Sequence, residues 1–316
     1  MHIDYAKCSR DGMIGGVGAI PGTLFAHFCD VIKMRQQLTG EKLSSAIRGV
    51  YRGDCRAKSS ISAGTTATFA SLKNFFAGAV PAVQQKVATR STMFLASSAS
   101  VQLFENKLGF NPTSAAFVGS ASSGYITGSI ASPWEWQKVL VSQRIKSPAA
   151  GNGVVGLFVE AKRHHGSVGA FECVGKRMHA AGVRNAIFDS TFFGVKRILE
   201  NWNNVSKSST CSEGGGKTKS TLVSSGFAYG VAAVTAVTVD YAVDVSVKRT
   251  YATGPESAIP SVGVLHHTLH MASREGLKIF RGLGAKSVEF GISYTITGLM
   301  APYISSFINL YIPTEQ

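Results

Sequence analysis

Acidic and basic residues recur in a regular arrangement at the ends of three apolar segments of this sequence. Each of three carboxylates is followed by a lysine three or four residues later: Asp30 by Lys33, Glu135 by Lys138, and Asp244 by Lys248. The carboxylates lie 105 and 109 positions apart. Pro133 precedes the second one, and a proline inside a helix kinks it by removing a hydrogen bond. If three such helix ends meet at one axis, these side chains can pair between helices and close a passage.

Histidine and cysteine residues form no comparable pattern. His266 and His270 have the spacing of two ligands on one helix face, but no HExxH motif accompanies them. The five cysteines are odd in number and none belongs to a CxxC pair, so neither a disulfide framework nor a zinc site is predicted. We therefore expect no catalytic residue, no metal and no cofactor apart from bound lipid, and we do not expect an enzyme.

The composition favours a membrane protein. Of 316 residues, 45% are hydrophobic and only 16% are charged, whereas soluble chains average about a quarter charged residues. The net charge of +14 is spread along the chain, which argues against a nucleic-acid groove and suits loops beside anionic lipid head groups. A soluble α/β enzyme with a buried parallel sheet is the alternative that this composition leaves open.

Six apolar stretches approach the length of about 20 residues that a membrane-spanning helix needs. They cover residues 13–32, 75–103, 114–141, 178–199, 221–247 and 283–312. Gly, Ser, Thr and a few charges interrupt all six, which suits a helix bundle with a polar interior better than six faces in lipid. Small residues four apart, as at Ser120 with Gly124 and Gly226 with Gly230, would let helices approach closely. We predict an all-α membrane protein with one domain, residues 1–316.

An internal repeat divides this domain into three units. The stretches Gly153–Gly166 and Gly263–Gly276 start 110 positions apart and each runs thirteen residues from glycine to glycine. Each is typical of a short amphipathic helix closed by a glycine C-cap. Together with the spacing of the carboxylates, this predicts repeats over about 1–108, 109–205 and 217–316, with a polar linker at 206–220.

The chain resembles a diverged member of the mitochondrial carrier family over nearly its whole length. The family's mark is a proline, then an acidic and a basic residue at the end of each odd-numbered helix. Here the three copies read Phe28-Cys-Asp30-Val-Ile-Lys33, Pro133-Trp-Glu135-Trp-Gln-Lys138 and Ala242-Val-Asp244-Val-Ser-Val-Lys248. An aromatic-x-Gly step before the even helices appears as Phe76-Ala-Gly78 and Phe280-Arg-Gly282, and as Phe171-Glu-Cys173 in the middle copy.

The resemblance implies a fold, a location and a gate. It implies six transmembrane helices in three pseudo-symmetric repeats with short amphipathic matrix helices, in the mitochondrial inner membrane, with both termini toward the intermembrane space. Bound lipid such as cardiolipin is expected. The matrix gate would pair the carboxylate of each repeat with a lysine of a neighbouring repeat: Asp30 with Lys138, Glu135 with Lys248, and Asp244 with Lys33. For Asp244 and Lys248, whose spacing differs, an interfacial charge that reaches toward water is an equal alternative.

The positions where the family contacts its solute lack a basic residue. Counting from the aromatic-x-Gly steps places these positions at Gln85, at Ala180 with Ala181, and at Glu289. Carriers of nucleotides and carboxylates usually place an arginine at one or more of these positions, because a guanidinium binds carboxylate or phosphate bidentately. Other cations, Arg90, Arg184 and Lys286, either face the interior or lie at the interface. Glu289, in an apolar helix, is expected to turn toward polar surroundings.

The family's second ring of charges, near the ends of the even helices, is also missing. Its aromatic-acidic pairs fall at Ser97-Ser98, Phe192-Phe193 and Ala301-Pro302, none of which is acidic. Without these three ion pairs, each of which contributes up to about 1 kcal/mol, the state closed on that side is destabilised. We therefore expect a protein that rests with that side open and its matrix side closed.

Two functions remain open from the sequence. The first is a carrier fold recruited as an accessory or structural subunit of a larger inner-membrane assembly, such as a respiratory chain complex. Its partners would be lipids and the proteins of that assembly. The alternative is an active solute carrier that moves a small metabolite by alternating access. No nucleic acid is expected as a partner of either.

Overall fold

Helices make up all the regular structure in the described part of this computed structural model, which covers residues 3–39, 41–52, 79–142, 153–208, 217–254 and 263–311. No strand occurs within these ranges. The long helices are α1 (Tyr5–Thr39), α4 (Ala79–Leu108), α5 (Pro112–Ser142), α7 (Gly153–Ser208), α8 (Lys217–Ala252) and α10 (Leu283–Tyr311). The short elements are α2 (Leu43–Arg52), α9 (Val264–Glu275) and the 3-10 helix η1 (Gly276–Phe280). The all-α class is confirmed, and the described residues contain no sheet of the kind that an α/β enzyme requires.

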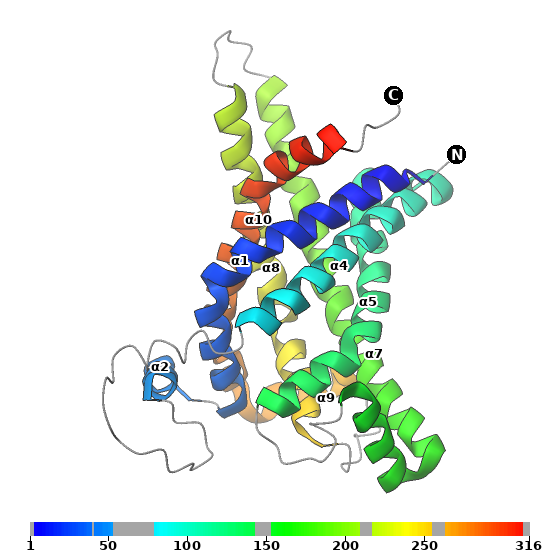
Figure 1. Ribbon diagram of the computed structural model, residues 1–316, viewed down its shortest axis with the longest axis vertical. Coiled ribbons are helices and arrows are strands. Elements are labelled where there is room, and N and C mark those ends of the chain that lie inside the picture. The colour runs from blue at the N-terminus through cyan, green and yellow to red at the C-terminus, as the bar shows by residue number, and fades with distance from the viewer. Residues whose placement is uncertain are drawn as a thin grey trace.

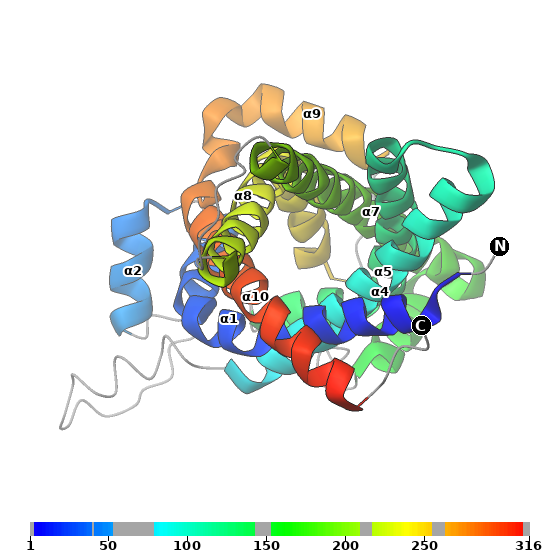
Figure 2. The ribbon, with the colours of Figure 1, turned by 90° about the horizontal axis from the view of Figure 1, so that it is seen from above.

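The long helices form a closed ring. Each packs against the next long helix along the chain, and α10 returns to pack against α1. Seen from above, they surround a common axis, while α2 and α9 lie at the periphery (Figure 2). In Figure 1 the beginning of α1 and the end of α10 lie at one end of the bundle. The short helices α2 and α9, together with the first part of α7, lie toward the opposite end. We call these the terminal end and the short-helix end.

The helices extend beyond the apolar segments from which they are expected. The first segment, 13–32, lies within a helix of 35 residues, and the fourth, 178–199, lies within α7. The polar linker expected at 206–220 is shorter than expected, because α7 continues to Ser208 and α8 already begins at Lys217. Hydropathy identifies only the apolar middle of a helix, whereas backbone hydrogen bonds continue through polar residues that carry no helix breaker. Residues 209–216 lie outside the described ranges.

The two glycine-bounded segments break where the sequence predicts. Gly166 has φ +71° and ψ 179° and interrupts α7, so that a short helix from Gly153 precedes the long one. Gly276 has φ +54° and ends α9, where its N–H donates to the Ala272 carbonyl. Positive φ at these values is strained for residues with a Cβ atom. Both short helices therefore end at a backbone conformation that glycine adopts more easily than any other residue.

Small residues let neighbouring helices approach closely, as expected. A Cβ atom at Gly124 of α5 would lie 2.8 Å from Asp189 Oδ2 of α7, and one at Gly230 of α8 would lie 2.2 Å from Thr295 Oγ1 of α10. Such distances leave no room for a larger residue. The side-chain positions along α7 and α10 are therefore set by contact with the backbones of α5 and α8.

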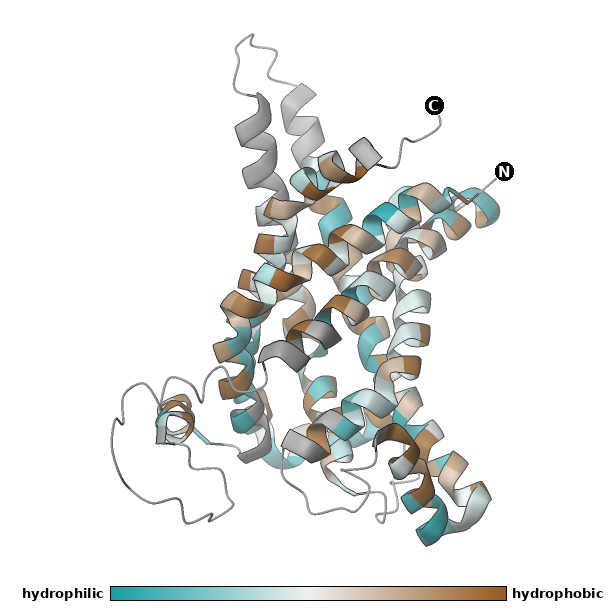
Figure 3. Ribbon diagram, viewed as in Figure 1, coloured by the Kyte–Doolittle hydropathy of each residue, from teal (hydrophilic) through white to brown (hydrophobic). Residues whose placement is uncertain are grey.

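Two helices are long and apolar enough to cross a membrane. These spans are Tyr5–Lys33 of α1 and Gly226–Ala252 of α8, the only ones found in the described residues. Buried core helices of soluble proteins pass the same test, and 61% and 67% of the two apolar windows are buried. Hydrophilic residues interrupt the hydrophobic ones along the long helices (Figure 3). Hydropathy thus gives weak support for a membrane location and identifies two of the six spans expected from the sequence.

Candidate functional site

A network of buried ion pairs lies inside the helix ring, and its first part joins α1, α4 and α10. Lys33 Nζ of α1 lies 2.6 Å from Asp30 Oδ1 of the same helix and 2.5 Å from Glu289 Oε2 of α10. The other oxygen of Glu289 accepts a hydrogen bond of 3.2 Å from Lys86 Nζ of α4. The Lys33 and Glu289 side chains are 4% and 5% exposed. Two ammonium groups and two carboxylates thus neutralise each other away from water.

The second part joins α5, α7 and α8 through Arg184. Its guanidinium donates two hydrogen bonds of 2.7 Å to the two oxygens of Glu135, and a third of 3.3 Å to Asp244 Oδ1. The bidentate geometry is the strong form of an arginine–carboxylate pair. A planar fork can bridge two acidic groups in this way, whereas an ammonium group acts as a point charge.

A third set of contacts ties α8 to α10. Lys286 Nζ lies 3.1 Å from Asp240 Oδ1 and 3.0 Å from Asp244 Oδ2. Lys248 Nζ approaches the same Asp244 oxygen at 3.1 Å from one turn along α8. The Phe290 ring links the parts, because Lys33 and Lys286 each lie 5.6 Å from its centroid. The three parts are therefore connected and together include side chains from all six long helices.

The charges of this network balance. Its carboxylates are Asp30, Glu135, Asp240, Asp244 and Glu289, and its cations are Lys33, Lys86, Arg184, Lys248 and Lys286. Removing one partner of a buried pair leaves an uncompensated charge and costs about 3–5 kcal/mol. The arrangement can therefore hold five helix pairs together electrostatically, and among these ten groups no net charge remains to attract a charged solute.

The structure brings most of the predicted gate residues together, but with different direct contacts. Glu135 and Asp244 share Arg184 of α7, whereas Lys248 of α8 and Lys33 of α1 were expected as their partners. Lys33 contacts Asp30 and Glu289, although Asp244 is within its electrostatic reach. The reason is the reach of long cationic side chains from α4, α7 and α10 into the ring. The side chain of Lys138 lies outside the described part of the structure.

The expected solute-contact positions have unlike surroundings. Glu289 turns toward polar partners, as its place in an apolar helix suggests. Ala180 and Ala181 are buried in a hydrophobic cluster with Trp136, and the Ala181 backbone packs against Gly128 of α5. The side chain of Gln85 lies outside the described residues. Of the described contact positions, only Glu289 therefore carries a polar group, and that group is already paired.

Two members of the network, Lys86 and Asp240, had no place in the sequence-based prediction. Lys86 follows the contact position Gln85 by one residue, and Asp240 precedes Asp244 by one helical turn. The signal that could identify Asp240 is this spacing, because residues four apart lie on one face of a helix. Lys86 carries no such signal, because it becomes a partner only once α4 packs beside α10.

Arg90 is a buried cation that lies apart from the ion pairs. It donates hydrogen bonds to Ser293 Oγ at 2.8 Å and Thr297 Oγ1 at 3.2 Å, and its guanidinium carbon lies 3.9 Å from the Tyr294 ring centroid. Among the described residues no carboxylate pairs with it. Neutral hydroxyl groups and a ring face offset its charge only in part.

Two further contacts fix the short-helix end around the network. Arg177 of α7 stacks on Trp136 at 4.0 Å and donates to the carbonyl oxygens of Thr253 and Gly254 at the end of α8. Arg249 of α8 donates to both carboxylate oxygens of Glu275 in α9. These hydrogen bonds from Arg249 lower the pKa of the Glu275 carboxyl below its ordinary value.

No family model matches this chain, and no curated protein matches it. The likeness to carriers therefore rests on the residues, repeats and ring of helices described above.

Proposed function

We propose that the protein is a diverged carrier-type membrane protein of the mitochondrial inner membrane, which acts as an accessory subunit of a larger assembly such as a respiratory chain complex. Its six long helices would each cross the membrane, in three repeats of two. Three observations support this arrangement: the closed ring of helices, the breaks at Gly166 and Gly276, which lie one repeat apart, and the position of both termini at one end of the bundle (Figure 1). The termini would face the intermembrane space and the short helices the matrix, beside anionic lipid such as cardiolipin.

The observation that carries the accessory role is the state of Glu289. At a solute-contact position, a carboxylate is useful to a transporter only if it can exchange its partners for the solute. Glu289 is buried between Lys33 and Lys86, and the other described contact positions, Ala180 and Ala181, are packed and apolar. A solute would have to displace these ammonium groups in a site of low exposure, which supports a structural role for the charges.

Native electrophoresis of gently solubilised mitochondrial membranes tests this role. The protein should migrate with a complex many times its own mass of 33.4 kDa. A Glu289→Gln variant that folds should migrate with the same complex, because its change lies inside the bundle and not on a docking surface. Migration of the wild-type protein on its own, with exchange activity after reconstitution, would overturn the proposal.

Arg90 supports the second candidate, an active solute carrier. A buried guanidinium with hydroxyl partners only is suited to receive a carboxylate or phosphate group of a small metabolite. Uptake into proteoliposomes of amino acids, keto acids, nucleotides and cations distinguishes the candidates. Saturable exchange that Arg90→Gln abolishes would establish transport, while absence of exchange in protein that is inserted and folded would favour the accessory role.

A further inference from the structure

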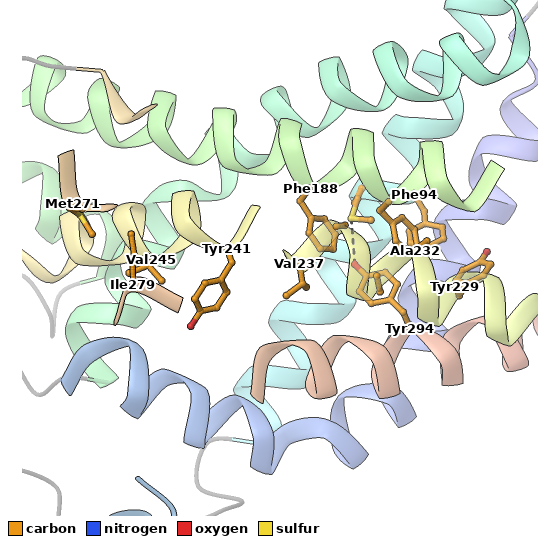
Figure 4. Packing of buried hydrophobic residues seen from close by; sticks show 14 residues of the cluster. Phe94, Phe188, Tyr229, Ala232, Val237, Tyr241, Val245, Met271, Ile279 and Tyr294 are labelled. Carbon is orange, nitrogen blue, oxygen red and sulfur yellow. Dashed lines mark hydrogen bonds between the residues drawn. The ribbon is translucent and has the colours of Figure 1, made fainter. Parts of the chain in front are cut away.

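A layer of aromatic side chains lies inside the ring on the terminal side of the ion pairs. Its members come from all three repeats, and Figure 4 shows Phe94, Tyr229 and Tyr294 close together beside Phe188. We call the following residues the aromatic layer: Phe94 of α4, Phe192 and Phe193 of α7, Tyr229 of α8 and Tyr294 of α10.

The rings of this layer are in mutual contact. Phe192 lies 4.7 Å from Tyr294, 5.0 Å from Phe193 and 6.0 Å from Tyr229, measured between ring centroids. Phe94 lies 5.2 Å from Phe193 and 6.2 Å from Tyr229. All these distances fall in the range of attractive aromatic pairs, about 4.5–7 Å. Phe192 has no exposed surface, and Phe94, Tyr229 and Tyr294 are also buried. The contacts therefore cross the interior of the bundle from α4 to α10.

Helix geometry separates this layer from the ion pairs. Phe192 follows Arg184 by eight residues on α7, and Phe94 follows Lys86 by eight on α4, which corresponds to about 12 Å along each helix. Both helices run toward the terminal end (Figure 1). The interior thus has two layers in series: an ionic one, whose titratable groups can relay protons, and an aromatic one, which cannot.

The aromatic layer occupies the place where acidic residues are missing. In the sequence, the second ring of charges is missing, and from this loss the side of the bundle opposite the matrix gate, its terminal end, is expected to be open. Phe192 and Phe193 stand at one of those positions, and Ser97 at another is buried with its hydroxyl 2.8 Å from the Ser123 hydroxyl of α5. Packing of large rings can hold helices together without any ion pair. The terminal end can therefore be closed without any acidic residue.

We propose that the aromatic layer seals the terminal end of the bundle against ions and water. This inference rests on the proposed membrane-spanning fold, but not on the accessory role. A constriction filled by packed rings excludes ions because it leaves no room for their hydration shell. The two cations beside it, Arg90 at 3.9 Å from the Tyr294 ring and Lys196 at 4.7 Å from the Tyr229 ring, further repel cations. Such a seal matters to an inner-membrane subunit, because a leak through its interior would dissipate the ion gradient that the membrane maintains.

Ion leak through proteoliposomes tests the seal. Wild-type protein and Phe192→Ser would be reconstituted at equal density, and proton entry driven by a potassium diffusion potential would be followed with an entrapped pH-sensitive dye. We expect wild-type vesicles to be as tight as protein-free vesicles and Phe192→Ser to leak at least about tenfold faster. Phe104→Ser is the matched control, because Phe104 contacts Phe110 at the end of α4, away from the layer. Equal leak in Phe192→Ser and wild type would overturn the proposal.

Access to Cys29 gives a second readout that does not depend on leak. Cys29 of α1 is buried, within electrostatic reach of Lys33 and Glu289. In a chain whose other cysteines are alanine, an impermeant thiol reagent applied from the terminal side should label Cys29 about tenfold faster after Phe192→Ala, and at the wild-type rate after Phe192→Leu, which keeps the space filled. Fast labelling of the wild-type chain would refute the seal. Failure of the protein to resist alkaline extraction from membranes would instead refute the membrane-spanning fold.

Discussion

Arg184 is the residue whose removal should damage the charge network most. In Arg184→Met, Glu135 loses both of its 2.7 Å hydrogen bonds, while Asp244 keeps Lys248 and Lys286. The loss therefore leaves one largely buried carboxylate, 20% exposed, without a hydrogen-bonding partner, which costs up to about 3–5 kcal/mol. At about 2 °C per kcal/mol for a chain of this size, the midpoint of thermal unfolding should fall by up to about 6–10 °C. Circular dichroism of the protein in mild detergent would measure this change.

Two control variants test whether the lost stability comes from the unpaired carboxylate. Arg197→Met also removes an arginine of α7, but that side chain is 43% exposed and 4.0 Å from Glu105, so a loss within about 1 kcal/mol is expected. Adding Glu135→Gln to Arg184→Met removes the orphaned charge and should restore most of the stability. Equal midpoints for the two arginine variants, or no recovery in the double variant, would refute the idea that buried charge pairing stabilises the ring.

Two other predictions concern the short-helix end. Because the folded pKa of Glu275 is depressed, its pair with Arg249 stabilises α9 above the ordinary carboxyl pKa and is lost as pH falls through the lower value. The protection of α9 amides against hydrogen exchange, taken relative to their intrinsic rate at each pH, should therefore fall on acidification in wild type, and in Glu275→Gln it should already be low at neutral pH. Replacing Arg177 by Met removes its stacking on Trp136 and its bonds to the end of α8; amides near Gly254 should then exchange faster while those at the middle of α8 stay unchanged, and uniform exchange would contradict this.

The sequence predicted the positions of charges along the helices better than their partners. Asp30, Glu135 and Asp244 are placed by a repeat of about one hundred residues, and the structure brings all three into one network. The partners of these carboxylates depend on how the helices are rotated and on how far lysine and arginine reach, which no spacing encodes. The spacing of Lys248 is four and not three, yet one helical turn is enough for it to contact Asp244 directly.

The glycines show why some local features can be read directly from a sequence. Gly166 and Gly276 end amphipathic segments at positions with positive φ, and this backbone conformation constrains one residue alone. The helix ends around residues 206–220 could not be read in the same way, because polar residues continue a helix as readily as they form a loop. The aromatic layer was missed for a third reason. Phe94, Phe192 and Tyr294 are ordinary apolar residues in sequence, and only packing of three repeats brings their rings together.

The ion pairs also determine how easily the bundle can open on the short-helix side of the aromatic layer. Opening between the repeats would separate at least three pairs: Lys33 with Glu289, Lys86 with Glu289, and Arg184 with Asp244. Even at about 1.4 kcal/mol for each pair, the open state would be about a thousandfold less populated. A solute can shift this balance only through contacts that it makes better in one state than in the other. Glu289 is already shared between two ammonium groups, whereas Arg90 has no carboxylate partner among the described residues, so Arg90 is the cation best placed to make such contacts. A transporter would use Arg90 to bind the solute, whereas an accessory subunit needs it only to pack on Tyr294.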